Sequence, residues 1–188
     1  MKLKPAALQG EYACSANTVR DVLMRLCTVG LVEFQMQRGF RATASSLERR
    51  RDVTRFRILL EQEGASESMA RGGLAWEAQL SAAHHKLLHI EQQIVAEENV
   101  KPYLPLWTAA EREFHETLIS ACESPLLTET FEKVYLQFRQ QLVGQQRDFE
   151  ASYFDAIIAE HQAIVDSALA RDQDACREAI YEHLKRNL

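Results

Sequence analysis

Between residues 17 and 29, apolar residues recur every three or four positions, which is the spacing of one face of an α-helix. Polar and basic residues occupy the other positions, so the pattern predicts an amphipathic helix with one buried stripe. Ser15 precedes it with a hydroxyl that can accept a hydrogen bond from an unpaired backbone N–H, and Gly30 follows it where helices commonly end. A shorter helix is expected over residues 6–13.

Two short β-strands are expected after this helix, over residues 31–35 and 39–44. Between them, Gln37-Arg38-Gly39 has the composition of a tight turn. Helix, helix and hairpin in this order predict a winged helix-turn-helix, in which the second helix enters the major groove of DNA.

After Ser45-Ser46 the apolar period becomes helical and remains so. With only 7 Gly and 4 Pro in 188 residues there is room for long helices, and one predicted break falls at Gly64. The fold class is therefore mainly α, with a winged-helix domain over 1–45 and an antiparallel helical bundle over 46–188. The helices of the bundle are expected over residues 46–63, 65–71, 74–100, 104–122, 125–145, 151–170 and 173–187.

The composition is ordinary for a globular protein, with 46% hydrophobic and 26% charged residues. It contains no run of about 18 apolar residues and no charged-then-apolar leader, so we expect no membrane span, no signal peptide and a cytoplasmic location. The four cysteines are scattered without a Cys-x-x-Cys pair, which favours free, reduced thiols.

The net charge of −5 argues against a nucleic-acid partner, but its distribution argues for one. Residues 1–57 contain eleven Lys and Arg against five Asp and Glu, a formal charge of about +6, which leaves about −11 for the remainder. A basic head on an acidic body is typical of a phosphate-contacting domain joined to a separate scaffold.

The first turns of the helix over 17–29 carry side chains suited to reading DNA. Arg20 lies outside the apolar stripe, where an arginine can bind guanine bidentately, and polar neighbours can contact bases or phosphates. Arg25 is expected to bind a phosphate, and Arg38 at the hairpin turn to reach the minor groove or a phosphate. The predicted DNA contacts are Ser15, Asn17, Thr18, Arg20, Arg25, Arg38 and Gly39.

Four residues of the helical part have spacings that suit a metal site between helices. Glu111 and His115 are four apart, so one helical face can present both. His161 and His183 each follow a glutamate, and each lies in a helix of its own. Three imidazoles and a carboxylate suit Zn²⁺, Ni²⁺ or a similar cation, with positions left open for a ligand oxygen. The alternative is four unrelated side chains satisfied by packing. The histidines within 84–89 lack such partners and are interpreted as a solvated helix face.

This organisation resembles the GntR family of bacterial transcription regulators, in its FadR-type branch, whose effector domain is the all-helical FCD bundle. Residues 15–23, Ser-Ala-Asn-Thr-Val-Arg-Asp-Val-Leu, are similar to the family's Ser-Arg-x-Pro-Val-Arg-Glu-Ala-Leu. Arg25-Leu26, Gly30-Leu31-Val32 and Arg38-Gly39-Phe40 follow in the family's order. Several linked short matches at the right spacing are more specific than any one of them.

The helical part resembles the same family. Residues 57–61, Arg-Ile-Leu-Leu-Glu, are similar to its Arg-x-x-Leu-Glu, and residues 111–115, Glu-Arg-Glu-Phe-His, to its Asp-x-x-Phe-His. The Glu-His pairs at 160–161 and 182–183 fall where its remaining histidines lie. The resemblance implies a divalent-metal site, zinc or nickel, formed by Glu111, His115, His161 and His183.

The resemblance also implies a role for Arg57, at the position where the family's motif points an arginine into the effector cavity. A guanidinium there would pair with an organic carboxylate, so that metal and arginine together bind a small carboxylic or sugar acid. The alternative is a solvated charge within a run of arginines.

Three departures from the family's pattern bear on these expectations. Ala16 stands where the family usually has an arginine, which removes one DNA contact. Glu111 replaces an aspartate and is longer by one methylene, so it could bind the metal directly, shift it or bind through water. The head also begins without the helix that normally precedes Lys4-Pro5: either the true start lies upstream of Met1 or the head lacks a supporting helix.

The sequence thus predicts a ligand-responsive regulator, a repressor, that acts as a homodimer on a double-stranded DNA operator. Two other functions remain open at this point. One is a metal-dependent enzyme built on a helical bundle, although no further acid/base pair or nucleophile is evident. The other is a helical protein-interaction module with a degenerate DNA-binding head.

Overall fold

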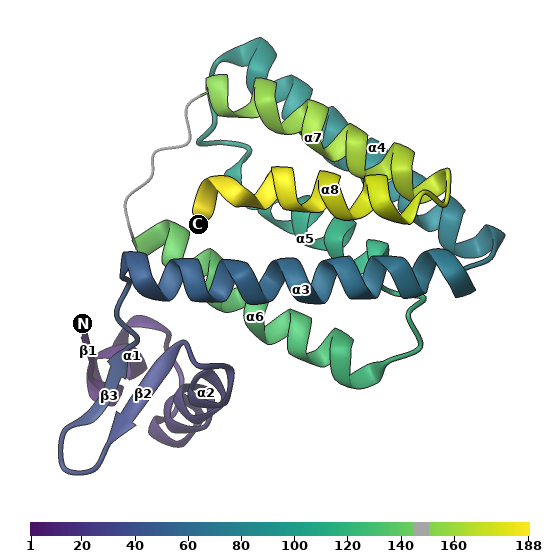
Figure 1. The fold of residues 1–188 in the computed structure, drawn as a ribbon. Coiled ribbons are helices and arrows are strands. Elements are labelled where there is room, and N and C mark those ends of the chain that lie inside the picture. Colours follow the sequence, from purple (N-terminus) through teal and green to yellow (C-terminus); the bar gives the residue numbers. More distant parts are fainter. Residues whose placement is uncertain (145–150) are drawn as a thin grey trace. The chain divides into compact units, whose positions relative to one another are not determined.

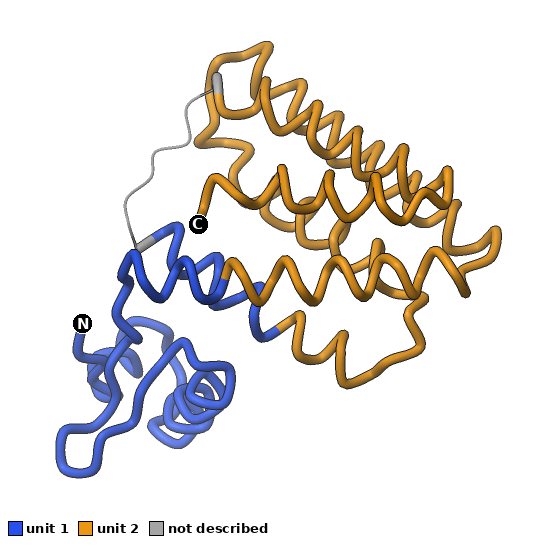
Figure 2. Tube along the Cα trace, viewed as in Figure 1, with its two compact units in different colours: residues 1–53, 133–147 blue, residues 54–132, 148–188 orange. Residues whose placement is uncertain are grey.

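The computed structural model describes residues 1–144 and 151–188. Within this part of the chain, residues divide into two compact units (Figure 2). Unit 1 contains residues 1–53 and 133–147, and unit 2 contains residues 54–132 and 148–188. The mainly helical fold class is confirmed, and Figure 1 shows the order of the elements.

Unit 1 has the helix and strand order of a winged helix. Its three-stranded antiparallel sheet has the strand order β1-β3-β2, and the hairpin pairs Phe34 with Phe40. The predicted helices and hairpin are present, whereas β1 was not predicted because two residues show no period. The elements are β1 (Lys2–Leu3), α1 (Pro5–Glu11), α2 (Ala16–Val29), β2 (Val32–Gln35) and β3 (Gly39–Ala42).

Both predicted ends of α2 are as the sequence indicates. Ser15 Oγ accepts a hydrogen bond from the Thr18 backbone N–H at 3.1 Å, which satisfies one of the orphan donors of the first turn. Gly30 ends the helix with a φ of 84°, a left-handed conformation that glycine adopts without strain. The apolar stripe of α2 contributes two of the four buried residues of the unit 1 core, which are Val19, Leu23, Val32 and Phe40.

The second half of α6 (Pro125–Gly144) also belongs to unit 1. Gln137 Nε2 donates to the backbone carbonyl of Val29 at 2.7 Å, and Gln140 Nε2 to that of Leu31 at 2.9 Å. The first amide binds a carbonyl in the last turn of α2, where a helix leaves its acceptors unpaired, and the second binds a carbonyl two residues farther on. Nothing in the local sequence pattern indicates this long-range pairing.

Unit 2 is a bundle of helices. In it α4 packs against both α5 and α7, and α7 packs against α8. Its apolar core includes both tryptophans, Trp76 and Trp107, which are buried as expected. The elements are α3 (Leu47–Arg71) from Thr54 onward, α4 (Leu74–Glu97), α5 (Leu104–Leu118), the first turns of α6, α7 (Ala151–Leu169), α8 (Gln173–Leu184) and the 3₁₀ turn η1 (Lys185–Asn187).

The predicted break at Gly64 is wrong, because α3 continues through it as one helix. A Cβ at this position would lie 2.8 Å from Ile119 Cβ and 3.0 Å from Leu127 Cδ2. The glycine therefore serves close packing of α3 against the segment that joins α5 to α6, and not chain reversal. The real end of α3 lies at Arg71, before Gly72-Gly73.

Arg171, which follows α7, closes the turn between α3 and α4. Its guanidinium donates to the carbonyls of Met69 and Gly72, at 2.7 Å for the latter, and pairs with Glu77. It also lies over the Trp76 ring, 5.0 Å from the centroid. One cation thus satisfies the carbonyls that α3 leaves unpaired at its end.

In the described part of the chain, no helix is long and apolar enough to cross a membrane. All four cysteines are free thiols; Cys122 and Cys176 are buried, whereas Cys14 and Cys27 are half-buried. Burial raises the pKa of the Cys176 thiol to about 11.

Candidate metal centre

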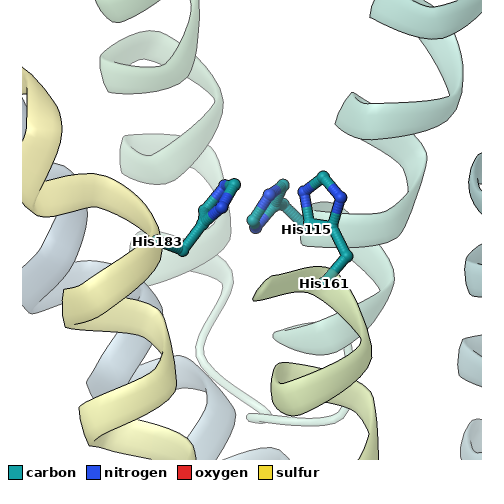
Figure 3. A group of neighbouring side chains, drawn as sticks. All are labelled: His115, His161 and His183. Carbon is teal, nitrogen blue, oxygen red and sulfur yellow. The ribbon is translucent and has the colours of Figure 1, made fainter. Parts of the chain in front are cut away.

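Three helices of unit 2 each place one histidine at a common point. His115 comes from α5, His161 from α7 and His183 from α8, and their rings gather inside the bundle (Figure 3). The ligand atoms of these three side chains all lie within 4.8 Å of one another. The structure therefore brings together three of the four residues that the sequence nominates as ligands.

Each ring turns its Nδ1 toward a carboxylate. His115 Nδ1 lies 2.7 Å from Glu61 Oε2, and His183 Nδ1 lies 3.0 Å from Glu160 Oε2. His161 Nδ1 lies 3.0 Å from Glu91 Oε1, although not aligned for a hydrogen bond.

A carboxylate beside Nδ1 favours the tautomer with the proton there, which leaves the Nε2 lone pair available. Among the described residues, Nε2 of His115 and Nε2 of His161 have no hydrogen-bond partner. Two buried ring nitrogens without partners are costly unless something else binds them.

The three imidazole rings lie close to one another. The ring centroids of His161 and His183 are 4.5 Å apart, and those of His115 and His183 are 5.3 Å apart in a stacked arrangement. The pKa of His183 lies well below its ordinary value. Burial is the largest cause, followed by the nearby His161, His115 and Arg57. His183 is therefore neutral at pH 7, which is the form of imidazole that binds a metal.

Glu111, the fourth nominated ligand, lies at the edge of this cluster. Its Oε1 is 3.5 Å from His115 Nε2 and accepts a hydrogen bond from Arg57 Nη2 at 3.1 Å. It is not part of the group whose ligand atoms all lie within 4.8 Å of one another. The same carboxylate oxygen therefore faces a histidine ligand on one side and a guanidinium on the other.

Arg57 is fully buried, so its interpretation as a solvated charge is wrong. Its Nε donates to Glu61 Oε1 at 2.5 Å, while the other oxygen of Glu61 faces His115. Burial alone would raise the pKa of Glu61, but the nearby Arg57 and His115 together hold that pKa below its usual value. Glu61 thus links the arginine to the histidine cluster.

Among the described residues beside the cluster are three buried carboxylates and one buried guanidinium. The carboxylates are those of Glu61, Glu91 and Glu111, and the guanidinium is that of Arg57. At formal charges these four groups sum to −2, and a divalent cation would bring the sum to zero. Since unbalanced charge is costly in a protein interior, the donor set and the charge both fit a divalent metal.

Sequence reasoning did not assign roles to the three carboxylates that orient the rings. Glu61 and Glu160 stand inside motifs that the sequence singles out, so their proximity to histidines carried a signal. Glu91, on α4, carried none: its Oε1 accepts a hydrogen bond from Trp107 Nε1 at 3.1 Å, a pairing that only the packed bundle reveals.

The second group of histidines is only partly a solvated face. His85 and His89 are exposed on α4, as expected. His84 is buried, which corrects the expectation for this residue, because its ring packs 5.8 Å from the ring of Phe114. Burial, and then His161, lower the pKa of His84.

The nominated DNA contacts are distributed over the surface of unit 1. Asn17, Arg20 and Arg25 are exposed on α2, while Val19 and Leu23 of the same helix face the core. Thr18 is also exposed, and its hydroxyl pairs with that of Ser15 at 2.8 Å.

The hairpin turn presents the remaining basic contact. Arg38 is exposed there, and its backbone N–H donates to the carbonyl of Gln35 at 3.0 Å. Gly39 has a φ of 76°, a left-handed conformation suited to glycine. The turn therefore holds an arginine at the tip of the wing without a bulky residue beside it.

Residues 52–186 match the family model of the FCD domain. The chain is 34% identical over 184 residues to the HTH-type transcriptional regulator BphR of Paraburkholderia xenovorans (strain LB400), covering 96% of this chain and 72% of that protein. It is 27% identical over 185 residues to the HTH-type transcriptional repressor GlaR of Escherichia coli (strain K12), covering 97% of this chain and 82% of that one.

Among solved structures, E. coli McbR/YncC is similar with a TM-score of 0.79 and 17% sequence identity. The match covers 98% of this chain and 84% of that one. At this identity the likeness shows a shared fold. The two sequence relatives are transcriptional regulators and not enzymes, so the enzyme alternative is set aside.

Proposed function

Because the chain belongs to the GntR family of transcriptional regulators, in the FadR-type branch with an FCD domain, we propose that it is a repressor responsive to a small organic acid. In this proposal unit 1 binds an operator, and unit 2 holds a divalent metal at which a carboxylic or sugar acid binds. The observation that carries it is the meeting of three buried imidazoles, each with a carboxylate beside its Nδ1.

The metal would be held by Nε2 of His115, His161 and His183, with Glu111 as a further carboxylate ligand. Histidine and carboxylate donors suit zinc or nickel, and such an ion supplies a Lewis-acid position that a carboxylate oxygen of the effector can occupy. Arg57, buried next to Glu111, would pair with the anion's charge.

On the DNA side, α2 would lie in the major groove with Asn17, Thr18 and Arg20 toward the bases. Arg25 and Arg38 would contact the backbone or the minor groove. We propose that the protein acts as a homodimer in the cytoplasm, so that two copies of α2 read two operator half-sites. Operator and effector must then influence each other's binding reciprocally.

The test compares His161→Ala with His89→Ala, since both variants remove a histidine but only the first removes a proposed ligand. Metal content of the purified protein and zinc titration are measured, together with operator binding in gel shifts at stated salt. We expect His161→Ala to lose its metal and its response to the organic acid while it keeps its helical circular dichroism spectrum. His89→Ala is expected to behave as wild type.

Unchanged metal content in a folded His161→Ala protein would contradict the metal assignment. Absence of operator binding by the wild-type protein would instead favour the remaining alternative, a helical interaction module with a degenerate DNA-binding head. The two results concern different units and are therefore read separately.

A further inference from the structure

A guanidinium and a proposed metal ligand both lie beside Glu111 Oε1 among the described residues. Arg57 Nη2 donates to it at 3.1 Å, and His115 Nε2, a proposed metal ligand, lies 3.5 Å away. The Arg57 and Glu111 side chains are 0% and 5% exposed, so neither charge is screened well by water. The position of Glu111 Oε1 therefore decides whether the carboxylate neutralises Arg57 or a bound metal ion.

The spacing between Glu111 and His115 is that of two ligands on one ion. Two donor atoms that each lie about 2.1 Å from a tetrahedral zinc are about 3.4 Å from each other. The observed 3.5 Å from Glu111 Oε1 to His115 Nε2 agrees with this spacing. Glu111 is not part of the group whose ligand atoms all lie within 4.8 Å of one another, so a full contribution to the ion requires it to move.

Movement of Glu111 toward the ion would weaken its bond to Arg57. Arg57 would keep Glu61, which binds its Nε at 2.5 Å and is itself held by His115. The guanidinium would therefore remain buried and oriented while its Nη2 exchanges the bond to Glu111 for another acceptor. Arginine presents a planar set of donors that suits a carboxylate in this situation.

We propose that Glu111 is a shared carboxylate, which neutralises Arg57 in the metal-free protein and transfers to the metal when the three histidines bind it. This inference rests on the proposed metal site and deepens it. Arg57 then becomes available to an organic carboxylate only after the metal is bound. The site accepts the metal first and the anion second, and metal-free protein is protected from responding to anions.

The experiment uses zinc alone as the probe and needs no knowledge of the effector. Zinc affinity is measured by competition with a chromophoric chelator for wild type, Arg57→Lys, Glu111→Gln and the double variant. Arg57→Lys keeps the positive charge beside Glu61 but removes the Nη2 arm that reaches Glu111. Glu111→Gln keeps the size of the side chain but removes its charge.

We expect Arg57→Lys to raise zinc affinity on the order of 10-fold, because Glu111 no longer has to leave a charged hydrogen bond. Glu111→Gln is expected to lower zinc affinity about 10-fold or more. In the Glu111→Gln background, Arg57→Lys is expected to have no effect beyond about 2-fold, since the competition no longer exists.

If Arg57→Lys changes zinc affinity equally in the wild-type and Glu111→Gln backgrounds, the proposal is overturned, because the arginine then affects zinc binding independently of Glu111. A Glu111→Gln protein with unchanged zinc affinity would overturn it as well. If wild type does not bind zinc and His161→Ala makes no difference, the metal site itself fails, which is a distinct result.

A second measurement does not depend on the folding of Arg57→Lys. Guanidinium resonances of ¹⁵N-arginine-labelled protein are followed during zinc titration, and the Arg57 signal is recognised because Glu111→Gln shifts it. If Glu111 transfers from Arg57 to zinc, the chemical shift of the Arg57 guanidinium changes on zinc addition in wild type and does not change in Glu111→Gln. No zinc-dependent change in wild type would contradict the transfer.

Discussion

The two units carry their functional residues in opposite ways. Unit 1 displays Asn17, Arg20 and Arg25 on the exposed side of α2, with few contacts to the rest of the protein. Unit 2 places His115, His161 and His183 inside the bundle, where each ring lies close to a carboxylate and to other rings. A surface site can therefore change without loss of stability, whereas a buried site is part of what holds its unit together.

The largest effect should come from Glu61, which serves both Arg57 and His115. We expect Glu61→Ala to lower the free energy of unfolding by about 3–5 kcal/mol, because it leaves the Arg57 guanidinium buried without its closest counterion. Chemical denaturation of the metal-free protein measures this change. A folded variant with wild-type stability would break the comparison, because the buried cluster would then be dispensable for folding.

The matched control is Glu63→Ala on the same helix. Glu63 is exposed, and its ion pair with Arg177 is long, at 3.8 Å. We expect Glu63→Ala to change the free energy of unfolding by no more than about 0.5 kcal/mol, as for most exposed positions.

The same contrast explains what could be predicted from sequence. Local signals were sufficient for α2 in unit 1: Ser15, the apolar stripe and Gly30 predicted its ends within one residue of Ala16–Val29. Gly64 failed because its role depends on Ile119 and Leu127, which are distant in the sequence. A local rule cannot distinguish a glycine that breaks a helix from one that lets two segments approach.

The candidate metal centre was predictable as a set of histidines but not as a network. His115, His161 and His183 occur in helical segments that resemble a family motif, so their convergence could be expected. Glu91 could not, because its position beside His161 and Trp107 follows from the packing of α4 against α5 and α7. Arg57 lies beside the histidine cluster, and its engagement by two carboxylates came only from the structure.

A smaller and more selective effect is expected for Arg20 in unit 1. Arg20→Ala should weaken operator binding by about 1–3 kcal/mol and non-specific DNA binding less, because a bidentate contact to a base is lost. Its free energy of unfolding should remain within about 0.5 kcal/mol of wild type, since the side chain is exposed. Gel shifts with operator and unrelated DNA, at one salt concentration, measure the difference.

Arg25→Ala sharpens this test, because Arg25 is predicted to contact a phosphate. Its loss should weaken both kinds of DNA by a similar factor and lower the salt dependence of binding. An equal loss for both DNAs in Arg20→Ala would reassign Arg20 to the backbone.

The cysteines give the mildest way to compare the units, because the comparison is made on the thiols of the wild-type protein. Cys176 in unit 2 is buried with a pKa raised to about 11, so at pH 8 it is a protonated thiol and not the reactive thiolate. Cys14 and Cys27 in unit 1 are half-buried and accessible in part. With a chromogenic disulfide at pH 8, we expect the unit 1 thiols to react in the native protein and Cys176 only after denaturation, with Cys176→Ser identifying its signal. Rapid native reaction of Cys176 would mean that unit 2 opens readily, and its functional residues would then be no more enclosed than those of unit 1.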